Sequence, residues 1–341
     1  MKKLRLLSSK ITLFSTLIIF VTMAIITSIT YVTMRSFFIK ESIQNLQNET
    51  ELISNDIENS LIKLENDLAV LSKTPPIDGI VRSDENNGQD PLENSNITIW
   101  KDRLAVIFAS ILKVNPEYTK IRYIGVKDNG KELVRVDQSR GDTFRTDDSA
   151  LQSRSDDSYY QQGIKLSQGS IRFSPITYNV EKGKITVPLT LTLRVMMPIY
   201  TKKQKIFGLL IINVNIQNYL QNVLNRTDKD YDVILYDKFN DFFIYNYKNQ
   251  TLAFYQANEK IPEGIFGNPS IKTTSKIISY LKSYKNSFIV TKKIHSSLTK
   301  NSEVLTMLIA TPKSRVLGTY HSLLNNLLLA IIVTFPPNLT P

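Results

Sequence analysis

The sequence of 341 residues has no cysteine and only two histidines, and these scarcities narrow the chemistry that it can carry. Without cysteine there is no disulfide framework, no thiolate metal site and no thiol nucleophile. His295 and His321 stand apart from each other and from any metal-binding spacing. A nucleophile-elbow motif and a phosphate-binding glycine loop are also missing. We therefore expect no catalytic residues, no metal and no cofactor, and a protein that is not an enzyme.

The positive charge of the chain does not point to nucleic acid. Lysine and arginine number 42 against 31 acidic residues, which gives a formal net charge of +11. A nucleic-acid interface needs a clustered basic patch, commonly interleaved with aromatic residues. The basic residues here are spread over the whole sequence instead. We expect no nucleic-acid partner.

A long apolar stretch near the N-terminus predicts a membrane span and makes the lipid bilayer an expected partner. Residues 11–34 contain no charge, glycine or proline. A helix of this length crosses a hydrocarbon core about 30 Å thick. The stretch is too long for a signal-peptide core and lacks a clear Ala-x-Ala cleavage site. The basic tail 1–10 is then cytoplasmic, and the chain from Arg35 onward lies outside.

A second span is expected at residues 317–335, which lack Lys, Arg, Asp and Glu. His321, Asn325 and Asn326 weaken this prediction and leave a terminal amphipathic or buried helix as the alternative. Two prolines then begin a short tail, 336–341. We expect that the chain is cut at its second membrane crossing.

Between these segments the sequence predicts helices first and strands afterwards. Apolar residues from Ile39 to Leu71 recur at steps of three, four or seven, which predicts one amphipathic helix over 37–74. Its apolar stripe is either a homodimer seam or the spine on which a sheet packs. Pro75 and Pro76 end this helix, residues 82–96 form a polar loop, and a second helix covers 97–114.

Strands in two successive cycles predict an α+β fold with two antiparallel sheet modules, a distal one at 75–224 and a proximal one at 225–315. Turn signals at 128–130 and 181–184 separate some of the first strands. A short helical stretch ending at Leu224 divides the cycles. The predicted strands are 121–126, 132–137, 170–178, 189–200 and 206–214, followed by 232–236, 242–247, 287–295 and 304–310.

Charged side chains on apolar strands are the candidate ligand-binding residues. Strand alternation places Leu133, Arg135 and Asp137 on one face, and Arg194 lies within another apolar strand. Arginine's planar fork suits a carboxylate, so a sheet face can direct several such groups at one small anion. The alternative is that each arginine pairs with a protein acid or reaches solvent. The candidates are Arg135, Arg194, Arg122 and Asp137, with Tyr178, Tyr160 and the adjacent Tyr159 as a pocket lid or simple packing.

Three segments carry a resemblance to a known family. They are RYIGVKDNGKELVRVD (122–137), GSIRFSPITYNVEKGKITVP (169–188) and LRVMMPIYTKKQKIFGLLIINVN (193–215). They resemble the membrane-distal module of double Cache sensor domains, which are the extracytoplasmic parts of bacterial sensor histidine kinases, chemoreceptors and diguanylate cyclases. The resemblance implies a PAS-like sheet in each module and a small-molecule ligand in the distal one. It also implies a bacterial inner membrane, with most of the chain in the periplasm.

The predicted function is therefore that of a membrane-anchored sensor for a small polar or anionic ligand, with its effector domain missing from this chain. No phosphoacceptor-histidine motif, ATP-binding glycine box or cyclase signature follows the second predicted span. Two alternatives stay open: a truncated receptor fragment that does not signal, and an extracytoplasmic adhesion or assembly scaffold.

Overall fold

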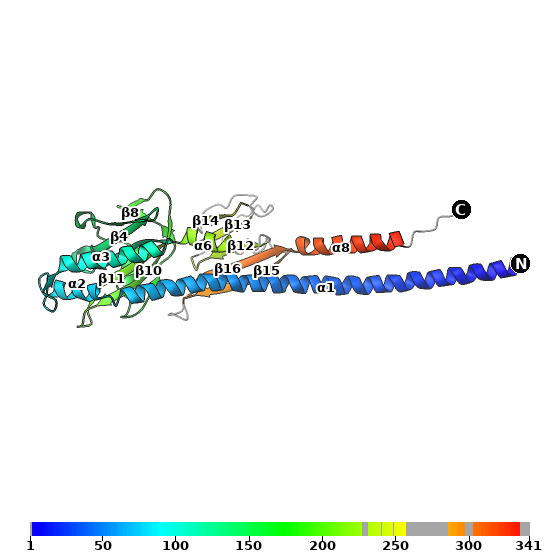
Figure 1. The fold of residues 1–341 in the computed structure, drawn as a ribbon, viewed down its shortest axis with the longest axis horizontal. Coiled ribbons are helices and arrows are strands. Elements are labelled where there is room, and N and C mark those ends of the chain that lie inside the picture. Colours follow the sequence, from blue (N-terminus) through cyan, green and yellow to red (C-terminus); the bar gives the residue numbers. More distant parts are fainter. Residues whose placement is uncertain are drawn as a thin grey trace. The chain divides into compact units, whose positions relative to one another are not determined.

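The computed structural model describes residues 2–226, 231–239, 241–247, 249–256, 286–296 and 303–334. It has the predicted α+β architecture, with a long N-terminal helix and two antiparallel sheets (Figure 1). The chain divides into two compact units. One comprises 1–49, 277–290 and 309–341, and the other comprises 50–276 and 291–308.

The first helix, α1 (Lys2–Leu71), is longer than predicted, because the membrane-span segment and the amphipathic segment form one uninterrupted helix. No glycine or proline lies between them to break it. Among the described residues, α1 is the one helix that is long and apolar enough to cross a membrane, and no residue of its apolar window is buried. The second predicted span falls in α8 (Lys313–Thr334) and stays a prediction.

The apolar stripe of α1 is buried along its last turns. Ile57, Leu61, Leu64 and Leu68 are between 0 and 4% exposed. Tyr118 of the first sheet donates a hydrogen bond to Asp67 at 2.7 Å. This part of the stripe is therefore the spine on which a sheet packs. The homodimer expected through the long helix stays a prediction.

The two prolines after α1 begin a helix that the sequence analysis missed. The prediction that the first helix stops before Pro75 is confirmed, but α2 (Pro75–Glu85) follows at once. Proline is tolerated in the first helical turn, where its missing N–H has no intrahelical partner in any case. The predicted loop at 82–96 therefore begins later than expected, and it contains the short strands β1 (Gln89–Asp90) and β2 (Ser95–Asn96).

Helix α3 (Ile97–Val114) has the predicted bounds. The side chain of Asn96 caps it by accepting a hydrogen bond from the amide of Ile99 at 3.0 Å. Trp100, in its first turn, donates to the buried Asp90 at 3.0 Å, and Asp90 also holds the guanidinium of Arg82. This contact ties α2, β1 and α3 together.

The first sheet has the strand order β5-β4-β3-β11-β10-β6, and β7 also pairs with β10. The prediction of one strand at 170–178 is wrong: two short strands stand there, because Pro175 between them lacks the N–H that a continuous ladder needs. Connecting elements are α4 (Lys127–Gly130) and η1 (Asp148–Ala150). The strands are β3 (Tyr118–Gly125), β4 (Glu132–Ser139), β5 (Asp142–Arg145), β6 (Arg172–Phe173), β7 (Thr177–Tyr178), β10 (Leu191–Tyr200) and β11 (Ile206–Asn215).

The central strands approach each other closely where β11 carries a glycine. A Cβ on Gly208 would lie 2.4 Å from the backbone oxygen of Ile124 on β3. That distance is far below any normal contact, so only glycine fits there. The close pairing holds β3 and β11 in the register that places Arg122 opposite Ile211.

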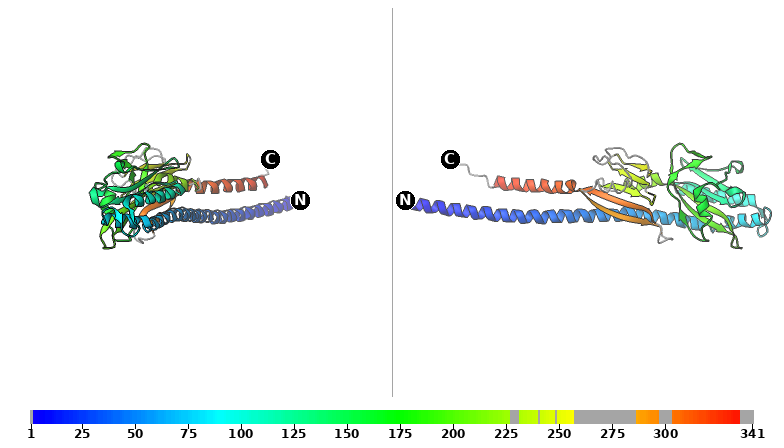
Figure 2. Two further views of the ribbon diagram at one scale, coloured as in Figure 1. Left: turned by 60° about the vertical axis from the view of Figure 1, so that its left-hand side comes forward. Right: turned by 180° about the vertical axis from the view of Figure 1, so that it is seen from behind.

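The second sheet has the order β14-β13-β12-β16-β15. Figure 2 shows it in two further views, with its last two strands in orange. Helix α6 (Ile216–Leu224) leads from the first sheet toward it, and Gln217 donates to the backbone oxygen of Leu252 on β14 at 3.0 Å. Strand β15 contacts α1, where Lys292 forms an ion pair with Glu51 at 2.5 Å. The strands are β12 (Asp232–Tyr236), β13 (Phe242–Asn246), β14 (Thr251–Tyr255), β15 (Ser287–His295) and β16 (Glu303–Pro312).

Candidate ligand-binding site

One face of the first sheet gathers the charged residues that the strands carry. Arg122 on β3 lies opposite Arg135 on β4, and Lys120 lies opposite Asp137. Paired residues of antiparallel strands point to the same side of a sheet. Asn213 on β11 is opposite both Lys120 and Arg194 of β10. All these side chains therefore share one face.

A β-bulge brings Glu132 onto the same face. The register between β3 and β4 shifts so that Ile124 pairs with Glu132 rather than with Leu133. Simple alternation would place Leu133 beside Arg135 and send Glu132 to the other side. The extra residue at the bulge reverses this, because one residue of β4 is left without a partner. The sequence prediction for Leu133 is wrong for this reason.

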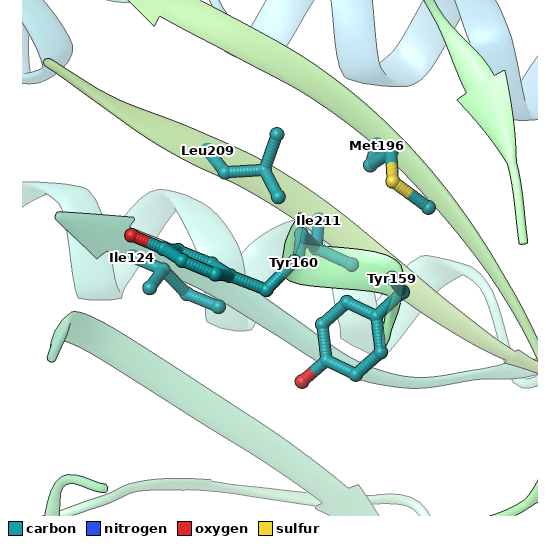
Figure 3. Packing of buried hydrophobic residues seen from close by; sticks show 6 residues of the cluster. All are labelled: Ile124, Tyr159, Tyr160, Met196, Leu209 and Ile211. Atoms are coloured by element: carbon teal, nitrogen blue, oxygen red, sulfur yellow. The ribbon is translucent and has the colours of Figure 1, made fainter. Parts of the chain in front are cut away.

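Helix α5 (Ser158–Gly163) covers the apolar half of the face (Figure 3). Its residues Tyr159 and Tyr160 pack on the sheet, and the hydroxyl of Tyr160 donates to the backbone oxygen of Gly125 at 3.2 Å. Gly163 allows this contact, because a Cβ there would lie 2.5 Å from Leu209. The cluster contains Ile124, Tyr159, Tyr160, Met196, Leu209 and Ile211.

The polar half of the face converges on one carboxylate, that of Glu181. The residue ends the short strand β8 (Val180–Glu181), which pairs with β9 (Lys184–Ile185) as a hairpin. One oxygen accepts from Arg122 at 3.1 Å and from Lys120. The other oxygen accepts from Arg135 at 3.0 Å and from Arg154 at 2.7 Å. Four cationic side chains thus hold a single carboxylate.

Buried Glu132 is the second carboxylate of the cluster. It accepts from the Nε of Arg154 at 3.0 Å and from the backbone amide of Gln152 at 3.1 Å, and it lies 3.4 Å from Arg122. Gln152 also donates its side-chain amide to Glu181 at 3.0 Å. The segment between β5 and α5 is therefore fixed to the sheet by these hydrogen bonds.

Arg135 and Asp137 form a bidentate pair within one strand. The Nε and Nη2 of the arginine donate to the two carboxylate oxygens at 2.7 and 3.0 Å. Asp137 also faces the ammonium of Lys120 at 3.0 Å. Arg135 therefore pairs with a protein acid, which was the alternative to ligand binding. Its remaining nitrogen, Nη1, binds Glu181.

Arg194 differs from the other cations of this face. Its side chain is buried, and its guanidinium stacks over the ring of Tyr159 at 4.9 Å and donates to the hydroxyl of Thr177 at 2.8 Å. Its Nε is buried without a hydrogen-bond partner. No carboxylate among the described residues forms an ion pair with it. Arg194 is thus a buried cation without a partner acid.

The crowding of charges shifts several pKa values. Burial, together with the positive charge of Arg122, lowers the pKa of Lys120 to about 8. Burial likewise lowers the pKa of Arg194 to about 10. Burial alone would raise the pKa of Glu181, but Arg122 and Lys120 hold that pKa well below its usual range. The face therefore favours a bound carboxylate in its ionised form.

The structure brings most of the predicted site residues together. Arg122, Arg135 and Asp137 lie in the ion-pair cluster, Arg194 is linked to it through Tyr159, and Tyr160 packs beside it. Tyr178 does not lie there, because its ring contacts Phe254 of the second sheet with centroids 6.1 Å apart. Tyr159, expected as a lid or a packing residue, also lies at the cluster. Sequence reasoning did not select Lys120, Glu132, Gln152, Arg154 and Glu181.

Alternation along β3 could have indicated Lys120, since it stands two residues before Arg122 on the same face. Alternation could not indicate Glu132, because the bulge changes the face of the sheet on which it lies. Arg154 and Glu181 lie in segments without a helix or strand periodicity, so no sequence pattern links them to the sheet.

The site does not suggest a metal. The part of the chain that the structure describes holds no group of three His, Cys, Asp or Glu residues suited to an ion.

Residues 92–261 match the family model described as bacterial histidine kinase, sensor domain. This segment, which contains the whole candidate site, is similar to that family. The predicted resemblance to double Cache sensor domains is confirmed.

Solved structures agree with this fold. The extracellular domain of the histidine kinase described as vpHK1S-Z8 has a TM-score of 0.55 and 19% identity, over 84% of this chain and 95% of that one. A domain of a sensory box/GGDEF family protein from Vibrio parahaemolyticus has a TM-score of 0.54 and 17% identity, over 80% and 99%. The extracellular domain of soHK1S-Z6 has a TM-score of 0.52 and 12% identity, over 83% and 98%. No significantly similar sequence was found among curated proteins.

Proposed function

We propose that the chain is a membrane-anchored extracytoplasmic sensor that binds a small anionic ligand, of the carboxylate class, on the charged face of the first sheet. The observation that carries the proposal is the convergence of four cationic side chains on one carboxylate position, with Arg194 close by. A bound carboxylate can use the same donors, because guanidinium groups bind carboxylates through paired, charge-assisted hydrogen bonds.

Burial makes this face selective. Arg122 and Arg194 are 1% and 5% exposed, so a ligand that reached them would be largely desolvated. A buried cation without a partner acid is costly, and an anionic ligand would relieve that cost. A neutral ligand of the same shape would leave Arg194 unpaired. We therefore expect anions to bind more tightly than their neutral analogues.

The route for a signal runs through contacts within the same compact unit. Strand β11 of the charged face leads into α6, whose Gln217 contacts β14 of the second sheet. In that sheet β15 contacts α1 through Lys292 and His295. Ligand binding would shift a pre-existing equilibrium of these elements, and α1 would carry the change toward the bilayer.

The proposal is tested by thermal unfolding of the full-length protein in lipid nanodiscs with acetate, succinate, inorganic phosphate and neutral succinamide. We expect succinate or acetate to raise the melting temperature, since a ligand that binds only the folded state stabilises it by mass action. Arg194→Met, which keeps an unbranched apolar stem and removes the guanidinium charge, should weaken the effect by about tenfold or more in ligand concentration.

Lys113→Met is the matched control, because Lys113 is exposed in the last turn of α3. It should respond as the wild type does. No shift with any anion, or an equal response of Arg194→Met and wild type, contradicts an anion site on this face. The adhesion or assembly scaffold would then be the better description.

A further inference from the structure

The carboxylate that fills the cationic cluster belongs to a hairpin that is exposed almost everywhere else. The hairpin consists of β8 and β9, joined by a turn at Lys182 and Gly183 with φ of 51° and 74°. Its apolar residues bury little: Val180 is 37% and Ile185 is 52% exposed. Two-residue strands of this kind are not stable by themselves. The hairpin needs an attachment to the domain.

Glu181 provides that attachment. Its carboxylate reaches Lys120, Arg122, Arg135 and Arg154, while its side chain is only 18% exposed. The neighbouring amide of Lys182 adds a hydrogen bond to Gln152 at 3.2 Å. Asn179 and Thr186 join the two arms at the base of the hairpin, where the amide of Asn179 also donates to the backbone oxygen of Thr190 at 2.8 Å.

We propose that Glu181 is a tethered internal ligand: its carboxylate occupies the anion position, and an external carboxylate binds by displacing it and releasing the β8–β9 hairpin. This inference rests on the proposed function and names the competitor that any anionic ligand meets. No covalent step is involved. The exchange replaces one carboxylate with another on the same four donors.

The charges of the cluster require such an exchange. The five cations Lys120, Arg122, Arg135, Arg154 and Arg194 face four carboxylates, those of Glu132, Asp137, Asp157 and Glu181. Withdrawal of Glu181 alone would leave an excess of two positive charges in a buried site. That state is unfavourable, because buried charges without partners carry a large desolvation cost. An incoming anion restores the balance, whereas a neutral molecule does not.

The competition has a simple quantitative consequence. A binding site that is open only a fraction of the time has an apparent Kd increased by the inverse of that fraction. A hairpin that occupies the anion position about 90% of the time weakens external binding about tenfold. Removing the charge of Glu181 should therefore tighten carboxylate binding by about tenfold. The release of the hairpin is the conformational change that ligand binding would couple to.

The experiment uses full-length protein in nanodiscs, with a spin label on the single cysteine of Lys184→Cys. The native chain has no cysteine, so the label reports on the hairpin alone. Glu181→Gln and Glu181→Ala should make the label mobile without any ligand. In wild-type protein, succinate should do the same in a saturable manner, and succinamide should not. Glu85→Gln, the same chemical change at an exposed glutamate of α2, should leave the label unchanged.

Calorimetric titration with succinate at constant ionic strength gives the second readout. We expect Glu181→Gln to bind succinate about tenfold more tightly than wild type and than Glu85→Gln. Weaker binding by Glu181→Gln overturns the proposal, since Glu181 would then assist the ligand. A label that stays immobile in both Glu181 variants also overturns it. If no variant binds succinate, the proposed carboxylate sensor fails, and label mobility still decides whether Glu181 holds the hairpin.

Discussion

At the scale of single residues, the site is defined by how each buried charge is balanced. Arg122 is fully buried but contacts Glu132, Glu181 and the hydroxyl of Tyr159. Arg194 is nearly as buried and contacts no acid among the described residues. The two arginines both lie on apolar strands in the sequence, but they have different roles in the structure. Arg122 organises the cluster, and Arg194 is left for a ligand.

Lys120 makes carboxylate binding sensitive to pH. Its pKa of about 8 lies below the ordinary value because of burial and the nearby Arg122 and Arg135, against the opposing effect of Asp137 and Glu181. Succinate affinity should fall by about tenfold between pH 7 and pH 9, because only the ammonium form donates to an anion with full charge. Calorimetric titration across this range measures the effect.

Lys120→Arg is the control for that prediction, since arginine keeps its charge throughout the range. A pH dependence that survives this substitution would show that another group titrates.

The lowered pKa of Lys120 also affects the stability of the protein. Between about pH 8 and the ordinary value of 10.5, the unfolded chain binds more protons at Lys120 than the folded one. Its contribution to the free energy of unfolding therefore rises with pH in this window.

At the scale of elements, three irregular features build the site on a regular sheet. The bulge in β4 turns Glu132 toward Arg122, the β8–β9 hairpin delivers Glu181, and α5 covers the apolar half of the face. Each of them departs from the regular period of a strand or helix. The regular strands hold the arginines at fixed spacing, and the irregular elements supply their counter-charges.

The seating of α5 is sensitive to one glycine. Gly163→Ala should lower the free energy of unfolding by about 2 kcal/mol, because overpacking a close contact costs roughly 1 to 3 kcal/mol. The new Cβ would lie 2.5 Å from Leu209 and 3.1 Å from the sulfur of Met196. Urea unfolding of the full-length protein in detergent, followed by tyrosine fluorescence, measures the change.

Gln161→Ala on the exposed side of the same helix is the matched control and should be neutral within about 0.5 kcal/mol. If Gly163→Ala is equally neutral, α5 is not seated on the sheet as described. A variant that loses stability should also bind succinate more weakly, since α5 carries Tyr159 beneath Arg194.

At the scale of the whole molecule, the long apolar window of α1 sets the expected topology. None of its residues is buried in the structure, as expected for a lipid-facing segment. The basic residues before it favour a cytoplasmic N-terminus. The two sheets would then lie outside the cytoplasm, where a sensor domain meets its ligand.

Because the chain lacks cysteine, single-cysteine labelling tests this topology without background. In intact spheroplasts, a membrane-impermeant maleimide should label Asp142→Cys, which is exposed on β5. It should label Ser8→Cys only after the membrane is broken. Labelling of both positions in intact cells, or the reverse pattern, contradicts the membrane-anchored arrangement.

The sequence by itself determined the class of the molecule. Helix and strand periods predicted α3 and α6, the hairpin at 232–247 and the long strands β10 and β11 at or near their observed bounds. The period of two also placed Arg122 and Arg135 on strands of one sheet. These features depend on local spacing, so they can be read without knowing the fold.

Only the tertiary structure decided which charges meet. Glu181 binds Arg122 across a separation of 59 residues and Arg154 across 27 residues, and both Glu181 and Arg154 lie in segments without a helix or strand period. The bulge places Glu132 on the face opposite to the one that strand alternation predicts. The ring of Tyr178 contacts Phe254 and not the cluster. Whether a buried ion pair forms depends on where separate elements pack and on how much water they exclude. Local sequence spacing determines neither of these.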